Sequence, residues 1–296
     1  MKIIILIIQF CLVYSETLQE AFDEAGPYEN YEKYVILESN SIYTGGIGIY
    51  EGSVFIDCNG SIIDLEQGNG IWVYADEYYP SSLDIQHCII TNSDYYGLSY
   101  GGSATGNVKN CNLINTNFGL KLFDNSNINV TNTIFAYNNT YGIGIYTELP
   151  IIDISYSLFW DNVESDCMEN CPGWGGIWTQ YELDENSGII YENPIFEDYT
   201  NWDFNLNSSS PCIDAGNPGL YDYDGSISDI GAYINNDDLC AIQGDLNEDS
   251  IVNILDVVEL VNCILFNDCN SICYDLNDDS EYNVLDILTI VNIIIN

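Results

Sequence analysis

The sequence predicts a mainly β protein in which a parallel β-helix is followed by a small α-helical segment. Three observations predict this architecture: β-forming phrases recur at a fixed spacing, aligned copies of the phrase give columns of like residues, and the pattern changes past Cys240. The chain accordingly divides into residues 1–15, 16–239 and 240–296.

The repeat is clearest between residues 85 and 146. Gly97, Gly119 and Gly142 each precede a leucine or isoleucine and lie 22 and 23 residues apart, a spacing typical of repeat folds. Each copy contains runs of β-forming residues divided by Asn, Gly and Ser, too short for helices and too regular for hairpins. A leucine-rich repeat would need regular leucines and a helical half-repeat, and both are lacking. Each copy is therefore predicted to form one turn of a parallel β-helix.

Stacked turns place equivalent residues above one another at about 4.8 Å, so columns of like residues are expected. Two such columns follow the anchor glycines, and strand alternation predicts that both face inward. They consist of Ile71, Leu98, Leu120, Ile143 and Ile177, and of Val73, Tyr100, Leu122, Ile145 and Thr179. Asn92, Asn115 and Asn138 are predicted to lie at a bend, because asparagine tolerates a left-handed backbone.

The N-terminal residues 1–15 have the pattern of a secretory signal peptide: one lysine, an apolar run and a small residue at Ser15. This run is too short to span a bilayer, and no other run is long and apolar enough, so no membrane insertion is predicted. The mature chain is expected to be secreted. Ten of the 11 cysteines remain once Cys11 is removed, and an even number in an oxidising compartment predicts several disulfides.

The charge of the chain excludes two classes of partner. Four lysines and no arginine face 46 acidic residues, which gives a formal net charge of -42. Repulsion therefore excludes nucleic acid and anionic membranes, whereas divalent cations are favoured. Most of the acids are interpreted as a solvated surface.

Residues 17–25 predict an N-terminal capping helix. Their apolar side chains fall on one helical face, Thr17 is a suitable N-cap, and Gly26 and Pro27 stop the helix. Because the open end of a β-helix exposes unpaired strand edges, this helix is expected to cover that end.

Several phrases outside the repeat carry a family resemblance. They are IYTGGIGIY at 42–50, NPIF at 193–196, SPCIDAGNP at 210–218 and DIGAY at 229–233. With these phrases, residues 17–233 resemble the secreted right-handed β-helix proteins of the pectate-lyase-like superfamily. The resemblance implies a right-handed parallel β-helix. It does not fix the chemistry, because the superfamily includes lyases, hydrolases, epimerases and inert adhesins.

Residues 245–256 and 275–286 are two copies of one acidic loop, thirty residues apart, each followed by an apolar helix at 257–265 or 287–295. Oxygen side chains at positions 1, 3, 5, 9 and 12, with the backbone carbonyl of position 7, have the spacing with which one loop wraps a calcium ion. The predicted ligands are Asp245, Asn247, Asp249, Ile251, Asn253 and Asp256, and Asp275, Asn277, Asp279, Glu281, Asn283 and Asp286.

This duplicated loop and helix resembles a type I dockerin, a calcium-dependent module that docks onto cohesin domains. The resemblance implies two calcium ions and a cohesin-type partner. Ser250 and Ser280 replace the glycine usual at position 6 of EF-hand-like loops. Positions 10 and 11, where dockerins carry recognition residues, hold the apolar pairs 254–255 and 284–285, so a familiar cohesin cannot be assumed.

The outward positions beside the apolar columns are rich in aromatic residues. Flat rings suit the C–H faces of sugars, so these residues are predicted to form a platform that binds polysaccharide. The predicted platform residues are Trp72, Tyr74, Phe123, Tyr146 and Trp178. Edge protection, contact with long loops and a protein interface are the alternatives.

Catalysis on this face stays open, with weak candidates at Lys121, Asp76, Glu77 and Glu148. Among so many acids, Lys121 is expected to have a raised pKa, the wrong direction for the base of a lyase. Two carboxylates about 5–10 Å apart would suffice for a glycosidase. The motifs of polygalacturonases are missing, and the single histidine, His87, is interpreted as an ordinary outward side chain on a strand.

Together these features predict a secreted, calcium-binding β-helix protein that binds or degrades extracellular polysaccharide and is attached through its dockerin to a cohesin-type partner. If it is an enzyme, it is a polysaccharide lyase or a glycoside hydrolase. The alternative is a non-enzymatic cell-surface or adhesion protein in which the β-helix is a spacer.

Overall fold

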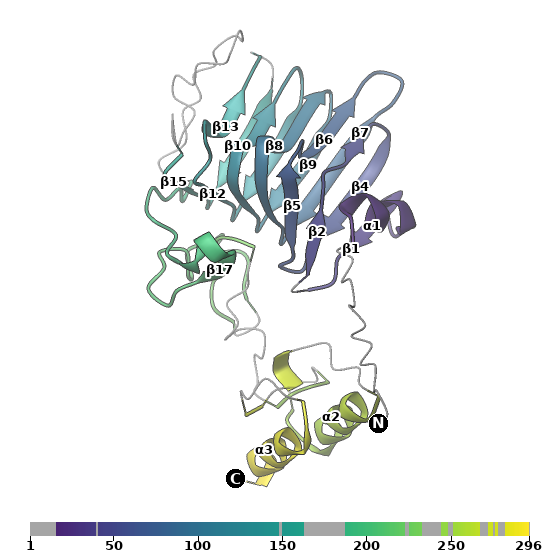
Figure 1. Ribbon diagram of the computed structural model, residues 1–296, viewed down its shortest axis with the longest axis vertical. Helices are drawn as coiled ribbons and strands as arrows, with labels where there is room; N and C mark the ends of the chain where they lie inside the picture. The colour runs from purple at the N-terminus through teal and green to yellow at the C-terminus, as the bar shows by residue number, and fades with distance from the viewer. Residues whose placement is uncertain are drawn as a thin grey trace, which may run out of the picture.

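The structure is a computed structural model that describes residues 16–39, 41–147, 150–162, 187–222, 225–232, 244–247, 251–266, 272–274, 276–277 and 282–295. Most of its strands belong to two parallel sheets, and successive turns of the chain add strands to both. Figure 1 shows these strands stacked as rungs, with helix α1 beside the first of them. The predicted parallel β-helix is confirmed.

The first sheet has six strands, and each of the first five pairs with the strand one turn further along the chain. Its order is β1 (Lys33–Ile36), β4 (Gly52–Asp57), β7 (Ser81–Gln86), β9 (Thr105–Lys109), β11 (Asn127–Thr131) and β14 (Ile151–Ser155). Its inward side is apolar because alternate residues stack in register, as Ile56, Ile85 and Val108 do.

The second sheet has nine strands. The main path runs β15 (Leu158–Trp160), β12 (Ile134–Ala136), β10 (Asn112–Leu122), β8 (Ile89–Gly102), β5 (Ile62–Gln67) and β2 (Ile42–Thr44), and beside it lie β3 (Gly48–Ile49), β6 (Ile71–Ala75) and β13 (Tyr141–Ile145). The long strands β8 and β10 bend, so their first halves pair with β5 and β12 and their second halves with β6 and β13.

The two predicted apolar columns exist. Ile71 pairs with Leu98, Leu98 with Leu120, and Leu120 with Ile143, and all four are buried. The second column, from Val73 through Tyr100 and Leu122 to Ile145, has the same register and is also buried. The fifth members of the columns, Ile177 and Thr179, lie outside the described residues.

Two of the three asparagines predicted to lie at a bend have the expected left-handed backbone. Asn92 and Asn115 have left-handed φ values of 63° and 52°. In the next turn Tyr137 takes that conformation, with φ 58°, and Asn138 is buried one position later. The Asn138 side chain accepts from the Thr116 amide at 3.1 Å and donates to the Leu113 carbonyl at 3.0 Å, so it joins adjacent turns.

Helix α1 (Leu18–Glu24) forms the predicted N-terminal cap. Thr17 and Glu20 make reciprocal hydrogen bonds that satisfy amides of the first turn, which begins the helix as predicted. Leu18 is fully buried in the core of the β-helix. At the other end of α1, the Lys33 ammonium donates to the carbonyls of Phe22 and Ala25.

A closing segment, residues 193–232, packs against the outside of the second sheet. It contains β16 (Phe196–Asp198), the 3-10 helix η1 (Tyr199–Asn201) and β17 (Asp203–Leu206). Phe204, Cys212 and Ile230 of this segment form a second apolar cluster with Ile114 and Ile134 of the sheet. The three later phrases of the family resemblance, which begin at residues 193, 210 and 229, therefore have a packing role.

The cysteines fulfil the disulfide prediction only in part. Cys58 and Cys88 form a disulfide, and Cys263 and Cys273 are disulfide-bonded as well. Cys111 is a free, buried thiol, as is Cys212 of the closing segment.

Past the closing segment the described chain is helical, with α2 (Ile254–Phe266), the 3-10 helix η2 (Ile272–Tyr274) and α3 (Val284–Ile295). Both α-helices begin three residues earlier than predicted, so the ends of the acidic loops already belong to their first turns. Leu260 and Ile290 are buried between the helices. No helix in the described part of the chain is long and apolar enough to cross a membrane.

Candidate functional site

The outward side of β6, β8, β10 and β13 carries a group of rings, which we call the aromatic face. Its members are Trp72, Tyr74, Tyr96, Phe118, Phe123, Tyr141 and Tyr146. Parallel pairing builds it: Trp72 lies beside Ser99, Ser99 beside Lys121, and Lys121 beside Gly144. The register that buries the apolar columns therefore also brings these outward side chains together.

The rings of the aromatic face contact one another. Trp72 and Phe123 are stacked with ring centroids 6.5 Å apart, and Phe123 and Tyr146 are 5.1 Å apart. Trp72, Phe123 and Tyr146 are half-buried, whereas Tyr74 is 38% exposed. The predicted platform residues in the described chain are thus neighbours, but they are more closely packed than freely exposed side chains would be. Trp178 lies outside the described residues.

Lys121 lies among three of these rings. Its Nζ is 4.5 Å from the ring centroid of Tyr146, 4.9 Å from that of Phe118 and 5.3 Å from that of Phe123. Such distances allow cation–π attraction. The arrangement needs Gly144, because a Cβ there would lie 3.0 Å from a Phe118 ring carbon and 3.2 Å from one of Tyr146.

The predicted direction of the Lys121 pKa is wrong. Burial lowers the pKa of the Lys121 amine, since the surrounding rings remove water from the charged form. Among the described residues no carboxylate forms an ion pair with it, so the excess of acids in the chain does not oppose this effect. The lowered pKa is the direction that a base requires.

The predicted acidic candidates have other roles or lie elsewhere. Asp76 accepts from the amides of Tyr78 and Tyr79 at 2.8 and 2.9 Å and so shapes the turn after β6. Glu77 is exposed in the same turn. Glu148 lies outside the described residues, and the structure brings no pair of carboxylates together on the described aromatic face.

Sequence reasoning missed three rings of the aromatic face. Tyr96, Phe118 and Tyr141 stack in register, and they are the most buried rings of the group. Each comes directly before one of the anchor glycines of the repeat. A column of aromatic residues preceding these glycines was therefore a visible signal.

The acidic loops end on two buried aspartates with identical surroundings. Asp256 Oδ1 accepts from the amides of Leu246 and Asn247 at 2.8 and 3.1 Å, and its Oδ2 accepts from the amide of Asn253 at 2.7 Å. Asp286 repeats this pattern in the second loop, with amide donors at 2.9, 3.3 and 2.8 Å. In both repeats the carboxylate at position 12 therefore binds described amides near the start and near the end of its loop.

The residues of these loops fit a calcium ion. Asp256 and Asp286 are fully buried carboxylates, and residues 240–296 contain no lysine, arginine or histidine that could balance their charge. A hard cation prefers oxygen ligands, and its positive charge would balance the buried carboxylates. Predicted ligands outside the described residues are Asp249, Asp275, Asp279 and Glu281. In the part that the structure describes, no group of three or more acidic, histidine or cysteine side chains forms a complete metal site.

Two family models match the chain. The model described as "Right handed beta helix region" matches residues 28–193, and that described as "Dockerin type I domain" matches residues 243–295. Among solved structures, the crystal structure of pectate lyase Pel9A is similar at 12% identity and a TM-score of 0.31, covering 74% of this chain and 90% of that one. No curated protein matches at a significant level. The chain belongs to the right-handed β-helix family and carries a type I dockerin at its C-terminal end.

Proposed function

We propose that this protein is secreted, binds extracellular polysaccharide on the aromatic face of its β-helix, and is attached through its dockerin to a cohesin-type partner. The single observation that carries the proposal is the aromatic face itself. Its three half-buried rings and the exposed Tyr74 lie side by side, and contiguous apolar surface of this kind often marks a binding site. Rings aligned along successive turns suit a polymer, because each turn adds a further position along the same surface.

The chemistry of the aromatic face favours sugar as the ligand. The half-buried rings of Trp72, Phe123 and Tyr146 supply flat apolar area at little entropic cost, since neighbouring rings already fix them. The exposed Tyr74 adds a hydroxyl at the rim. The Lys121 ammonium supplies a hydrogen-bond donor between the rings, which suits the hydroxyl or carboxylate oxygens of a saccharide.

Calcium binding in the dockerin is part of the proposal. Asp256 and Asp286 would each hold one ion, together with the other predicted ligands of their loops. Bound calcium would supply positive charge to the buried carboxylates and thereby favour the folded loops. The amide donors to Asp256 and Asp286 keep both carboxylates at the ends of the loops.

The proposed partner surface lies at the starts of α2 and α3. Ile254 and Leu255 are 65% and 57% exposed, and the matching Val284 and Leu285 of the second repeat are 61% and 49% exposed. Exposed apolar pairs of this kind mark protein interfaces. These pairs occupy loop positions 10 and 11, and their exposure in both repeats supports docking by an apolar surface.

A second candidate function is cleavage of a uronate-containing polymer by β-elimination. The observation that favours it is the lowered pKa of Lys121, which raises the fraction of free amine able to accept a proton. In this reaction the amine would take the proton from the carbon beside the uronate carboxyl. The C–H electron pair would then form a double bond as the glycosidic C–O bond one carbon further along breaks, and the leaving oxygen would take a proton from water.

The test is incubation of the mature protein with acidic and neutral polysaccharides in the presence of calcium. Retention of protein by the polymer, new reducing ends and unsaturated-uronate absorbance are followed together. Retention without cleavage would support binding alone, and absorbance that Lys121→Met abolishes would support the lyase. A protein that neither retains nor alters any polymer would be a spacer, and the proposal would be wrong.

A further inference from the structure

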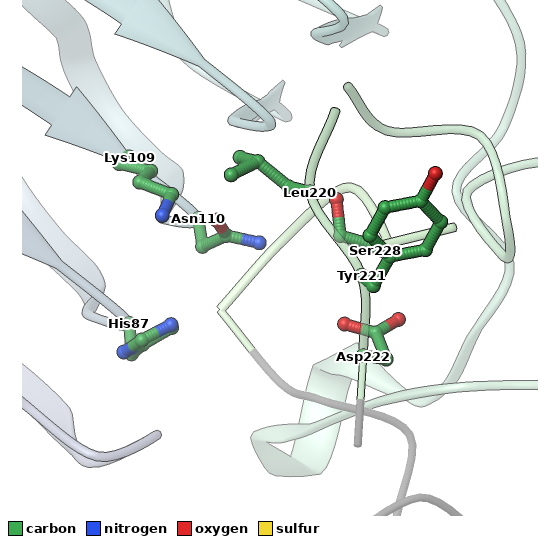
Figure 2. A pocket seen from close by; sticks show the side chains of 7 residues that line it. All are labelled: His87, Lys109, Asn110, Leu220, Tyr221, Asp222 and Ser228. Carbon is green, nitrogen blue, oxygen red and sulfur yellow. The ribbon is translucent and has the colours of Figure 1, made fainter. Parts of the chain in front are cut away.

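A pocket lies where the turns of the β-helix meet the closing segment, and we call it the turn pocket. It has a volume of about 220 Å³. His87 and Asn110 line it from the turns after β7 and β9, Lys109 lines it from the end of β9, and residues 220–222 and Ser228 line it from the closing segment (Figure 2). Segments more than a hundred residues apart in sequence thus build one cavity, separate from the aromatic face.

Lys109 gives the turn pocket a positive group that is not used elsewhere. Its half-buried ammonium makes no hydrogen bond or ion pair with any residue that the structure describes. The other described lysines do have partners: Lys33 binds carbonyls at the end of α1, and Lys121 lies among rings. With 46 acidic residues against four lysines, an ammonium without a carboxylate partner is available to an anion.

His87 is held beside Lys109 by its own partner. Its backbone has a left-handed φ of 50°, in a turn and not on the strand that the sequence predicted. The ring Nδ1 lies 3.1 Å from Asp57 Oδ1, and Gln86 donates to the other oxygen of Asp57 at 2.6 Å. Burial raises the pKa of the Asp57 carboxyl, but the hydrogen bond and charge of His87, together with hydrogen bonds from Gln86 and the Asn59 amide, outweigh burial and lower that pKa. Nδ1 is thus engaged, while Nε2 has no hydrogen-bond partner among the described residues.

The wall of the turn pocket opposite Lys109 carries a hydrogen-bond acceptor, the Asp222 carboxylate. Figure 2 shows Tyr221 and Asp222 across the pocket from His87 and Lys109. The Asp222 carboxylate accepts from the Asp229 amide at 2.9 Å, which fixes its position. Asn110 donates to the Asp229 carbonyl at 3.1 Å and ties the two walls together. The pocket therefore offers donors on one side and an acceptor on the other, on a tied framework.

We propose that the turn pocket binds one carboxylate-bearing sugar unit. The carboxylate would face Lys109 and His87, where hydrogen bonds to a charged group are strongest. The sugar hydroxyls would donate to Asp222, and the ring of Tyr221 would lie beside the sugar. The volume is below the roughly 300 Å³ at which pockets for larger organic ligands begin, so a single sugar unit suits it. The choice of a sugar over another small acid rests on the proposed function.

The test is calorimetric titration of the mature full chain with glucuronate and galacturonate, and with glucose and galactose as neutral counterparts. The wild type is expected to bind an acidic sugar and neither neutral one. Lys109→Met keeps the aliphatic stem and removes one charge-assisted contact, so affinity should fall at least about tenfold. Lys33→Met removes the same charge elsewhere and should leave the affinity unchanged. His87→Gln gives a second variant, with an expected loss of at least about threefold.

The proposal would be overturned if the wild type bound neither acidic sugar, or bound the neutral sugars equally well. Unchanged affinity in Lys109→Met would also overturn it. So would tighter binding of glycine, because that would mean a site for zwitterions. The two proposals fail separately. Acidic sugar bound through Lys109, with polymer retention unaffected by Tyr74→Ala, would sink the proposed function alone. Retention lost in Tyr74→Ala, with no acidic sugar bound by the wild type, would sink the turn-pocket proposal alone.

Discussion

At the scale of single residues, the environment of Lys121 decides its chemistry. The charge of -42 on the whole chain would favour the ammonium, but exposed charges more than about 10 Å apart are screened by salt. The rings of Phe118, Phe123 and Tyr146 lie within 5.3 Å of Nζ and act without such screening. Local desolvation therefore outweighs the net charge of the molecule and the cation–π attraction, both of which favour the ammonium.

We expect Lys121 to titrate below the ordinary lysine pKa of about 10.4. Because its pKa is lowered in the folded state, the charged form opposes folding at neutral pH. Stability should then rise as pH increases through the folded pKa toward the unfolded one. NMR titration of carbon-13-labelled, methylated lysines measures this pKa, and loss of one signal in Lys121→Met assigns it. A titration at or above the ordinary value would contradict the account.

The buried Asn138 should be far more important to stability than an exposed asparagine. Asn138→Ala would leave the Thr116 amide and the Leu113 carbonyl buried without their present partner, so we expect a loss of about 3 kcal/mol or more in the free energy of unfolding. Asn129→Ala removes only an exposed hydrogen bond to Asn107 and should cost under about 0.5 kcal/mol. Denaturant unfolding of both variants measures the difference, and equal losses would show that the buried hydrogen bonds of Asn138 are not stabilising.

At the scale of elements, helix α1 protects the first turn of the β-helix. Leu18 is fully buried beneath α1, while its neighbour Gln19 is exposed. We expect Leu18→Ala to lower the free energy of unfolding by about 2–5 kcal/mol, because it leaves a cavity under the helix. Gln19→Ala is the matched control and should change it by less than about 0.5 kcal/mol. A small effect of Leu18→Ala would mean that α1 does not close the core.

The two acidic loops should each bind one calcium ion. Calorimetric titration of the mature chain at physiological ionic strength is expected to give two ions per chain. Asp256→Asn removes the buried charge of the first loop and should leave one ion. Asp198→Asn removes an exposed charge outside the loops and should leave two. If Asp256→Asn still bound two ions, the predicted ligand set would be incorrect.

At the scale of the whole molecule, the repeated features could be predicted and the unique ones could not. The column from Ile71 to Ile143 follows from the sequence because every turn imposes the same inward position. The surroundings of Lys121 depend on Gly144 and on rings from adjacent turns, so no single copy of the repeat reveals them. The turn pocket depends on how Asp222 of the closing segment packs against a distant turn. Periodicity contains no information about that contact.

The central claim is that the aromatic face binds polysaccharide. Tyr74 is the most exposed ring of this face, and Tyr28, 57% exposed beside Tyr34, is a matched exposed tyrosine elsewhere. Neither substitution should shift the melting temperature greatly, since both side chains are exposed. By analogy with bases stacked on aromatic side chains, loss of one stacking ring should cost about 1–3 kcal/mol of binding.

The measurement that tests this claim most directly is affinity electrophoresis through gels containing the retained polysaccharide, with melting temperatures recorded on the same samples. Because about 1 kcal/mol of binding free energy corresponds to about fivefold in affinity, the account predicts that Tyr74→Ala weakens retention about fivefold or more. Tyr28→Ala should migrate as the wild type does. Equal retention of all three proteins at unchanged melting temperature would contradict it and leave the β-helix a spacer.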